Sequence, residues 1–131
     1  MIMPALLLIL NHRITAAQEA DARTSLGVDR IVEMPESLAA LWSQIPPDLE
    51  TIESFLKPVQ SWLSESASPG DYVLIQGDFG ACYLMVTFAF SKELVPVYST
   101  TSREALENHY PDGTVEVSHK FKHRLFRRYG A

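Results

Sequence analysis

Cysteine is almost absent from this 131-residue sequence, which contains only Cys82. A single cysteine cannot form an internal disulfide, so the fold must be held by an apolar core, and we expect a reducing, cytoplasmic setting. Cys82 stands in a dense apolar run, where a buried structural thiol is more common than a nucleophile. The class of small disulfide-stapled proteins is therefore excluded.

Long apolar runs are also missing. The longest one near the amino terminus covers residues 3–10, which is too short to span a bilayer, and no basic leader precedes it. We therefore expect neither a membrane anchor nor a signal peptide. With 47% apolar residues, the chain can bury one core, and we expect a single domain over residues 1–131.

Positive charge is in short supply, because 11 lysines and arginines face 16 acidic residues, which gives a net charge of −5. This balance argues against general binding of long nucleic acids. The basic residues are unevenly distributed: residues 112–131 carry a net +3, and the rest of the chain carries −8. A small anionic ligand fits the basic end, while long duplexes are repelled elsewhere.

Apolar runs separated by turn residues predict an α/β fold. The run at residues 5–10 is typical of a strand buried on both faces. Thr15 and Gln18 form a capping-box pattern for a helix that stops near Gly27. Residues 29–34 predict a second strand, and such a strand–helix–strand unit places its two strands in parallel.

The same alternation continues through the middle of the chain. Apolar residues recur at helical spacing over residues 49–63, and Pro58 should kink or divide that helix. Residues 72–76 predict a third strand, residues 81–92 an apolar helix, and residues 95–99 a fourth strand. The whole pattern predicts a Rossmann-like parallel sheet flanked by helices.

The final third is ambiguous. Residues 102–109 have helical composition, but residues 110–114 form a strong hairpin-turn pattern. After this turn, apolar and histidine side chains alternate with polar ones as far as residue 123, which is the periodicity of a strand. We therefore expect a C-terminal β-hairpin that projects from the sheet, and leave the conformation of residues 102–109 open.

Two polar loops follow predicted strands, and ligands of open parallel sheets bind at the carboxyl ends of the strands. The first loop contains Asn11, His12 and Thr15. Asn11 and His12 can hold a phosphate or a ribose, whereas Thr15 serves equally well as a helix cap. We place the candidate site where this loop meets the second one, Gln76, Gly77, Asp78, Phe79 and Gly80.

The second loop is neither a Walker loop nor a dinucleotide-binding fingerprint. Its glycines allow the backbone to approach a ligand. Gln76 and Phe79 can contact a base or a ribose, although Phe79 suits the core as well, and Asp78 is equally suited to cap the next helix.

The basic tail supplies the remaining candidates. His123 can transfer a proton, and Arg127 can bind phosphate, with Arg103 as a further ligand-binding residue. A solvated hairpin is the alternative for the whole segment. No Ser-His-Asp order and no spacing of metal ligands stands out, so we expect no metal and no cofactor.

Several motifs together resemble one protein family over nearly the full length. They include residues 11–18, 25–28 and 42–47, the segment at residues 70–81, and residues 112–114 and 121–129. These motifs are similar to those of small type III CRISPR-associated proteins, the Csx family numbered twenty. Where that pattern often has serine, this chain has Asn11, which lacks a hydroxyl group.

The resemblance implies a CARF-like Rossmann fold and a homodimer that binds cyclic tetra-adenylate. Such a ring nuclease linearises its ligand by attack of a ribose 2′-hydroxyl, without a metal, and so ends an antiviral response. In this interpretation Asn11 and His12 position the ribose-phosphate, and His123 or Arg127 stabilises charge or transfers a proton. A protein that only sequesters the ring, a module for another nucleotide and a purely structural protein are the alternatives.

Overall fold

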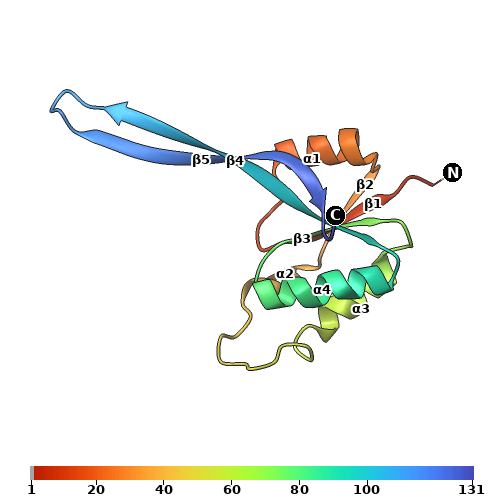
Figure 1. Cartoon of the computed structure of the whole chain (residues 1–131). Helices are drawn as coiled ribbons and strands as arrows, with labels where there is room; N and C mark the ends of the chain where they lie inside the picture. The colour runs from red at the N-terminus through yellow and green to blue at the C-terminus, as the bar shows by residue number, and fades with distance from the viewer. Residues whose placement is uncertain (1) are drawn as a thin grey trace.

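The computed structural model describes residues 2–131 as a five-stranded sheet with helices on both faces (Figure 1). Strands β1 to β4 are parallel, β5 is antiparallel to β4, and the order across the sheet is β2-β1-β3-β4-β5. This arrangement confirms the predicted Rossmann-like α/β fold with a C-terminal β-hairpin. The strands are β1 (Ala5–Ile9), β2 (Arg30–Glu33), β3 (Tyr72–Ile75), β4 (Val95–His109) and β5 (Val115–Arg128).

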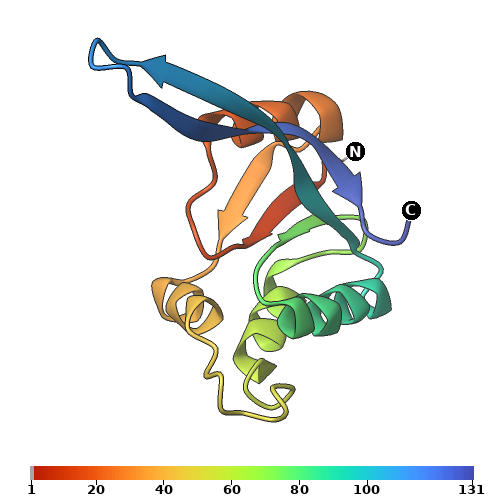
Figure 2. The same cartoon turned by 60° about the vertical axis from the view of Figure 1, so that its left-hand side comes forward.

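The helices form two unequal layers (Figure 2). One face of the sheet carries α1 (Ala16–Asp21), which continues directly into the π-helical segment η1 (Ala22–Leu26). The other face carries α2 (Glu36–Ser43), α3 (Lys57–Ser66) and α4 (Phe79–Ser91). No helix within residues 2–131 is long and apolar enough to cross a membrane.

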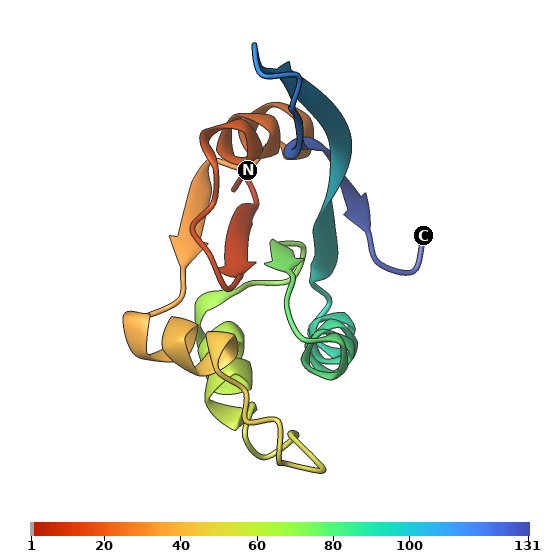
Figure 3. The ribbon, with the colours of Figure 1, turned by 90° about the vertical axis from the view of Figure 1, so that its left-hand side faces the viewer.

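The sheet divides the apolar core in two, as Figure 3 shows with the helices above and below the strands. Leu7 and Ile9 face α2, α3 and α4, whereas Leu6 and Leu8 face α1. Because β1 is covered on both faces, every residue of the strand is apolar, as the sequence predicts. The loop that follows β1 therefore starts from a fully buried strand.

The expected helix over residues 49–63 is wrong in its first half. Residues 49–56 form turns, and α3 begins only at Lys57, with Pro58 in its first turn. Proline lacks a backbone N–H and is favoured at this position, since the first amides of a helix have no partner inside the helix. Ile52 and Phe55 still pack against the core from the turns.

The ambiguous residues 102–109 belong to β4, and each of them pairs with a residue of β5. Strand pairing therefore overrides their helical composition, and the projecting hairpin is confirmed. We call residues 102–124 the arm. Its residues are exposed except for Ser102 and His123.

Candidate functional site

The two predicted site loops leave neighbouring strands. Ile9 and Ile75 are paired across β1 and β3, and the Gln76 amide donates to the Ile9 carbonyl oxygen at 3.1 Å. The loop after β1 and the loop at residues 76–80 therefore start side by side, at the carboxyl ends of parallel strands. This is the edge at which ligands of such sheets bind.

A cavity of about 600 Å³ lies on the β2 side of the first loop. This volume is sufficient for a nucleotide-sized group. No residue of the second loop lines it, so the two loops contribute different surfaces to the edge. The polar side chains in the lining are Asn11, His12, Arg13, Glu33, Glu36, Ser43 and Gln44.

His12 is exposed and lines this cavity. Its Nδ1 atom lies 2.8 Å from the carbonyl oxygen of Arg13. Because a carbonyl oxygen only accepts hydrogen bonds, Nδ1 carries a proton, and the neutral ring keeps the lone pair on Nε2. The first loop therefore holds an imidazole whose Nε2 can accept or return a proton.

The cavity combines charges of both signs. Arg13 offers a donor for a phosphate, whereas Glu33 and Glu36 offer acceptors. Carboxylates repel phosphate but accept hydrogen bonds from hydroxyl or amino groups, so this lining favours a ligand that carries both kinds of group. Thr15, by contrast, accepts from the Gln18 amide in the predicted capping box.

Most polar side chains of the second loop have structural partners. Gln76 Oε1 accepts from the Ser99 amide at 2.9 Å, and Asp78 caps α4 by accepting from the Ala81 amide at 2.9 Å. Gln76 therefore joins β3 to β4 and does not point a free carboxamide oxygen at a ligand. For Asp78, the capping interpretation is the one that the structure supports.

Gly77 permits a close approach of the chain to Trp42. The indole Nε1 of Trp42 donates to the Gln76 carbonyl oxygen at 2.9 Å, and a Cβ on Gly77 would lie 2.7 Å from the same nitrogen. Trp42 is buried and cannot move aside. The second loop thus needs glycine at this position for packing, whatever it binds.

Phe79 has a different environment, because 94% of its surface is exposed. It begins α4, and Tyr83, one turn further on, is also largely exposed. Exposed aromatic rings are costly to leave in water and stack well on bases. The core interpretation of Phe79 is wrong, and its ring is available for a ligand or a partner.

Arg127 lies on the α4 face of the sheet. Its Nη1 donates to the hydroxyl of Tyr98 at 2.9 Å, and its guanidinium carbon lies 5.5 Å from the centroid of that ring. Tyr98 in turn contacts Tyr129, whose hydroxyl donates to the Ile75 carbonyl oxygen at 2.6 Å. This stack of rings holds an exposed guanidinium close to the end of β3.

Burial on this face also affects two titratable groups. It raises the pKa of Tyr129 to about 12, and it raises the pKa of the half-buried Cys82 thiol. Both groups are therefore neutral near neutral pH. A neutral thiol is a poor nucleophile, which agrees with a structural role for Cys82.

His123 lies on the opposite face, against α1. Its Nδ1 is 2.6 Å from Ser99 Oγ and its Nε2 is 2.7 Å from Asp21 Oδ2, while only 5% of its side chain is exposed. Hydrogen bonds from Ser25 and from His123 hold the pKa of Asp21 below its ordinary value of 3.8. We call Asp21, Ser99 and His123 the clamp.

No Ser-His-Asp order stands out in the sequence, yet the fold brings a serine, a histidine and an aspartate into contact. The three residues are far apart in the chain, and a β-bulge beside Thr100 brings them together. In hydrolytic triads the carboxylate bonds Nδ1 and the nucleophile bonds Nε2, whereas the clamp has the reverse arrangement. With Ser99 buried as well, the clamp joins α1 to the base of the arm and is not a nucleophilic centre.

The predicted basic tail thus does not form one wall of the site. His123 and Arg127 lie on opposite faces of the sheet. Arg103 lies on the arm, with its guanidinium carbon 5.9 Å from the ring centroid of Phe121. Arg127 is connected to the end of β3 through Tyr98 and Tyr129, whereas His123 is connected to Gln76 through Ser99.

Comparisons with known proteins give a family match. The sequence model described as "Uncharacterized protein MJ1673 family" matches residues 4–127. A similar protein is "Uncharacterized protein MJ1673" of Methanocaldococcus jannaschii, which is 50% identical over 127 residues, covering 97% of this chain and 98% of the relative. No solved structure matches the chain.

Replacing Gly77 by alanine is predicted to destabilise the fold by about 2 kcal/mol, because the new methyl group collides with Trp42. Denaturant-induced unfolding measures this change. Gly80→Ala is the matched control, since its Cβ meets its nearest neighbour only at 3.5 Å. Equal stability of the two variants would contradict the packing role assigned to Gly77.

The clamp makes stability depend on pH. Because the folded-state pKa of Asp21 is lowered, its contribution is complete above 3.8 and is lost as the pH falls through the folded value. Asp21→Asn should therefore be less stable than the wild type near pH 7, and the difference should vanish near pH 2. Urea unfolding across this pH range measures the difference, with Asp48→Asn at an exposed position as the control. A difference in unfolding free energy between the wild type and Asp21→Asn that does not depend on pH would contradict this role of the clamp.

Proposed function

The chain belongs to the Uncharacterized protein MJ1673 family, and we propose that it is a ring nuclease that binds and linearises cyclic tetra-adenylate in the cytoplasm. The resemblance of its motifs to the Csx family numbered twenty suggests the ligand. The observation that carries the proposal is the exposed imidazole of His12 at the cavity, with Nδ1 bonded to the Arg13 carbonyl and Nε2 free. This group supplies the proton transfer that linearisation requires.

The proposed reaction is an intramolecular displacement. A ribose 2′-hydroxyl attacks its own 3′ phosphorus, the bond from phosphorus to the next 5′ oxygen breaks, and a 2′,3′-cyclic phosphate and a 5′-hydroxyl form. His12 accepts the 2′ proton at Nε2, the leaving 5′ oxygen takes a proton from water, and His12 then returns its proton to the solvent. Because nucleophile and phosphate belong to one nucleotide, the protein needs only to align them and stabilise the developing charge.

The polar lining of the cavity suits the ribose, the adenine and the phosphate of a nucleotide. Glu33 and Glu36 can accept hydrogen bonds from ribose hydroxyls or an adenine amino group, while Arg13 and Asn11 can donate to the phosphate. On the other side of the edge, Phe79 can stack on a second adenine. A twofold-symmetric ring also suits a homodimer with two equivalent sites.

A protein that only sequesters the ring is a second candidate. Thr15, Gln76, Asp78 and His123 all have structural hydrogen bonds, which leaves few free side chains for catalysis. Stacking and phosphate binding do not need those side chains. This observation favours binding without cleavage over any role that requires a larger catalytic set.

Incubation of the protein with labelled cyclic tetra-adenylate and EDTA separates the candidates. We expect a linear product that ends in a 2′,3′-cyclic phosphate. A ring that binds tightly and stays intact would reject the nuclease and leave sequestration. A ring that does not bind would reject both.

His12→Ala is predicted to lower the single-turnover cleavage rate by about 100-fold or more, the usual contribution of a positioned acid–base group. Since His12 is exposed, the melting temperature should not change. His109→Ala, which removes an exposed histidine near the tip of the arm, is the control and should cleave normally. Full activity of His12→Ala would contradict the assigned role.

Arg127→Ala is predicted to weaken ring binding by about 10-fold, the loss expected for one charge-assisted hydrogen bond to phosphate. The salt dependence of the dissociation constant should decrease at the same time. Titration of labelled ring at several salt concentrations measures both quantities. Arg30→Ala, at the amino end of β2, is the control and should bind the ring like the wild type. An equal loss of affinity in both variants would contradict a specific contact between Arg127 and a phosphate.

A further inference from the structure

The arm exposes more surface than a chain of this size normally does. The protein has 8493 Å² of accessible surface, whereas a compact monomer of 14.7 kDa has about 6,900 Å². The excess of roughly 1,600 Å² exceeds the roughly 800 Å² that each partner buries in a standard protein interface. Figure 1 shows its origin, since the arm extends away from the body of the protein.

The two faces of the arm differ in polarity. Directly paired residues point to the same face, so Val115, Val117, Phe121 and Ala105 share one face. The pairing places Arg103, Glu107, His109 and His119 on that face as well. The opposite face has Leu106 as its large apolar residue and is otherwise polar. Phe121 is 68% exposed and Leu106 39%. An isolated two-stranded ribbon is marginally stable in water, so the apolar face is suited to being covered.

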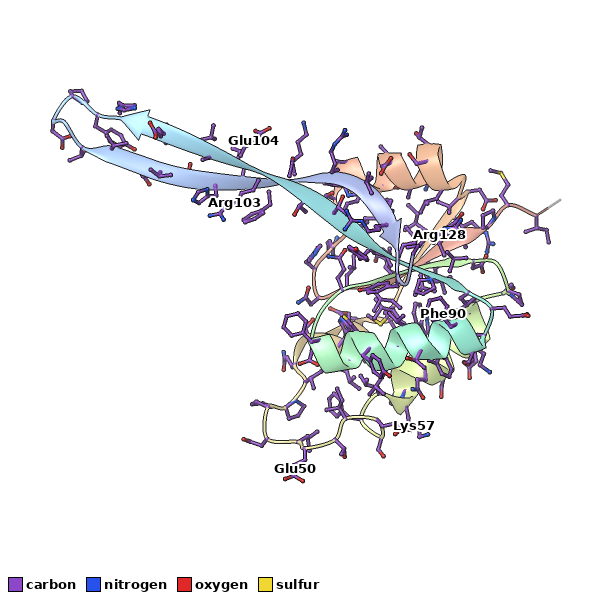
Figure 4. All side chains as sticks on the ribbon, in the orientation of Figure 1. Glu50, Lys57, Phe90, Arg103, Glu104 and Arg128 are labelled. Carbon is purple, nitrogen blue, oxygen red and sulfur yellow. The ribbon has the colours of Figure 1, made fainter. Side chains whose placement is uncertain are left out.

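Charge is also polarised along the arm. The distal part, residues 105–119, has three acids and no lysine or arginine: Glu107, Asp112 and Glu116. The proximal part, residues 102–104 and 120–124, has four basic residues against one acid: Arg103, Lys120, Lys122 and Arg124 against Glu104. Figure 4 shows Arg103 and Glu104 on opposite sides of the ribbon. The two ends therefore carry −3 and +3. On the apolar face itself the paired charged residues are Arg103 toward the base and Glu107 toward the tip, because Glu104, Glu116, Lys120 and Lys122 belong to the other face.

With Arg103 toward one end and Glu107 toward the other, this face complements a copy of itself turned end over end. We infer that the arm is a dimerisation element, on which two copies of this chain stack their apolar faces with antiparallel arms. A parallel alignment would instead bring like charges together. Such an isologous contact has twofold symmetry, in which every interaction occurs twice.

Ala105 is the natural centre of this contact. With the twofold axis beside this small residue, Arg103 lies opposite the partner's Glu107, two positions beyond the axis on the same strand. The pairing of β4 with β5 then places Phe121 opposite the partner's Val117. The same alignment brings each tip, residues 110–114, to the base of the partner's arm, next to the carboxyl edge of the sheet. The clamp sets the direction of the arm and so the geometry of the dimer.

Charge exchange between Arg103 and Glu107 tests this contact. Arg103→Glu and Glu107→Arg should each weaken the homodimer by about 10-fold or more, because like charges then face each other twice. A mixture of the two variants should form a heterodimer of normal affinity, and the double variant should regain the homodimer. Mass measurement by light scattering over a dilution series, without any nucleotide, gives these affinities.

Phe121→Ser and Leu106→Ser form a second, matched pair. The first should give a monomer of 14.7 kDa at concentrations where the wild type is twice that mass, and the second should stay dimeric. This inference describes how the expected homodimer forms and does not depend on ring cleavage. Either the dimer contact or the nuclease activity can therefore be disproved without the other. The dimer contact would be overturned by a monomeric wild type or by a mixture of Arg103→Glu and Glu107→Arg that stays monomeric. It would also be overturned if neither Phe121→Ser nor Leu106→Ser weakened the dimer.

Discussion

A chain of hydrogen bonds runs from Gln76 at the end of β3 through Ser99 and His123 of the hairpin to Asp21 of α1. It joins α1 to the hairpin and adds a side-chain link to the backbone pairing of β3 with β4. Without it, β4 would lose its lateral support where it leaves the sheet, and the direction of the arm would not be fixed. Both the carboxyl edge and the arm therefore depend on this polar connection.

This connection also divides the roles of the polar residues at the edge. Among the residues that hold the fold, Gln76 Oε1, Asp78 Oδ1 and both ring nitrogens of His123 have hydrogen-bond partners within the protein. Residues that remain available lie on two sides: His12 at the cavity beside β2, and Phe79 on the α4 side. A ligand that contacts both must reach across the carboxyl edge of the sheet, and bases that stack on Phe79 together with phosphates near His12 suit these two side chains. A cyclic oligonucleotide has these properties, which is the physical basis of the proposed function.

Local patterns were sufficient to predict most of the fold. The apolar run of β1 and the Thr15 capping box each depend on neighbouring residues, and the sequence predicted both. The clamp could not be predicted, because Asp21 and His123 are 102 residues apart and meet through a bulge that no local pattern reveals. Residues 102–109 were ambiguous for the same reason, since their strand exists through pairing with β5. Of the candidate site, sequence predicted its edge, whereas the tertiary contacts decided which side chains stay free.

The central claim is that a cyclic oligoadenylate binds at the carboxyl ends of β1 and β3. Amide NMR of the protein titrated with 2′-deoxy cyclic tetra-adenylate, which lacks the attacking hydroxyl, tests this most directly. The account predicts saturable shifts of the amides at residues 11–14 and 77–80. Shifts confined to the opposite edge of the sheet, or no shifts at all, would contradict it.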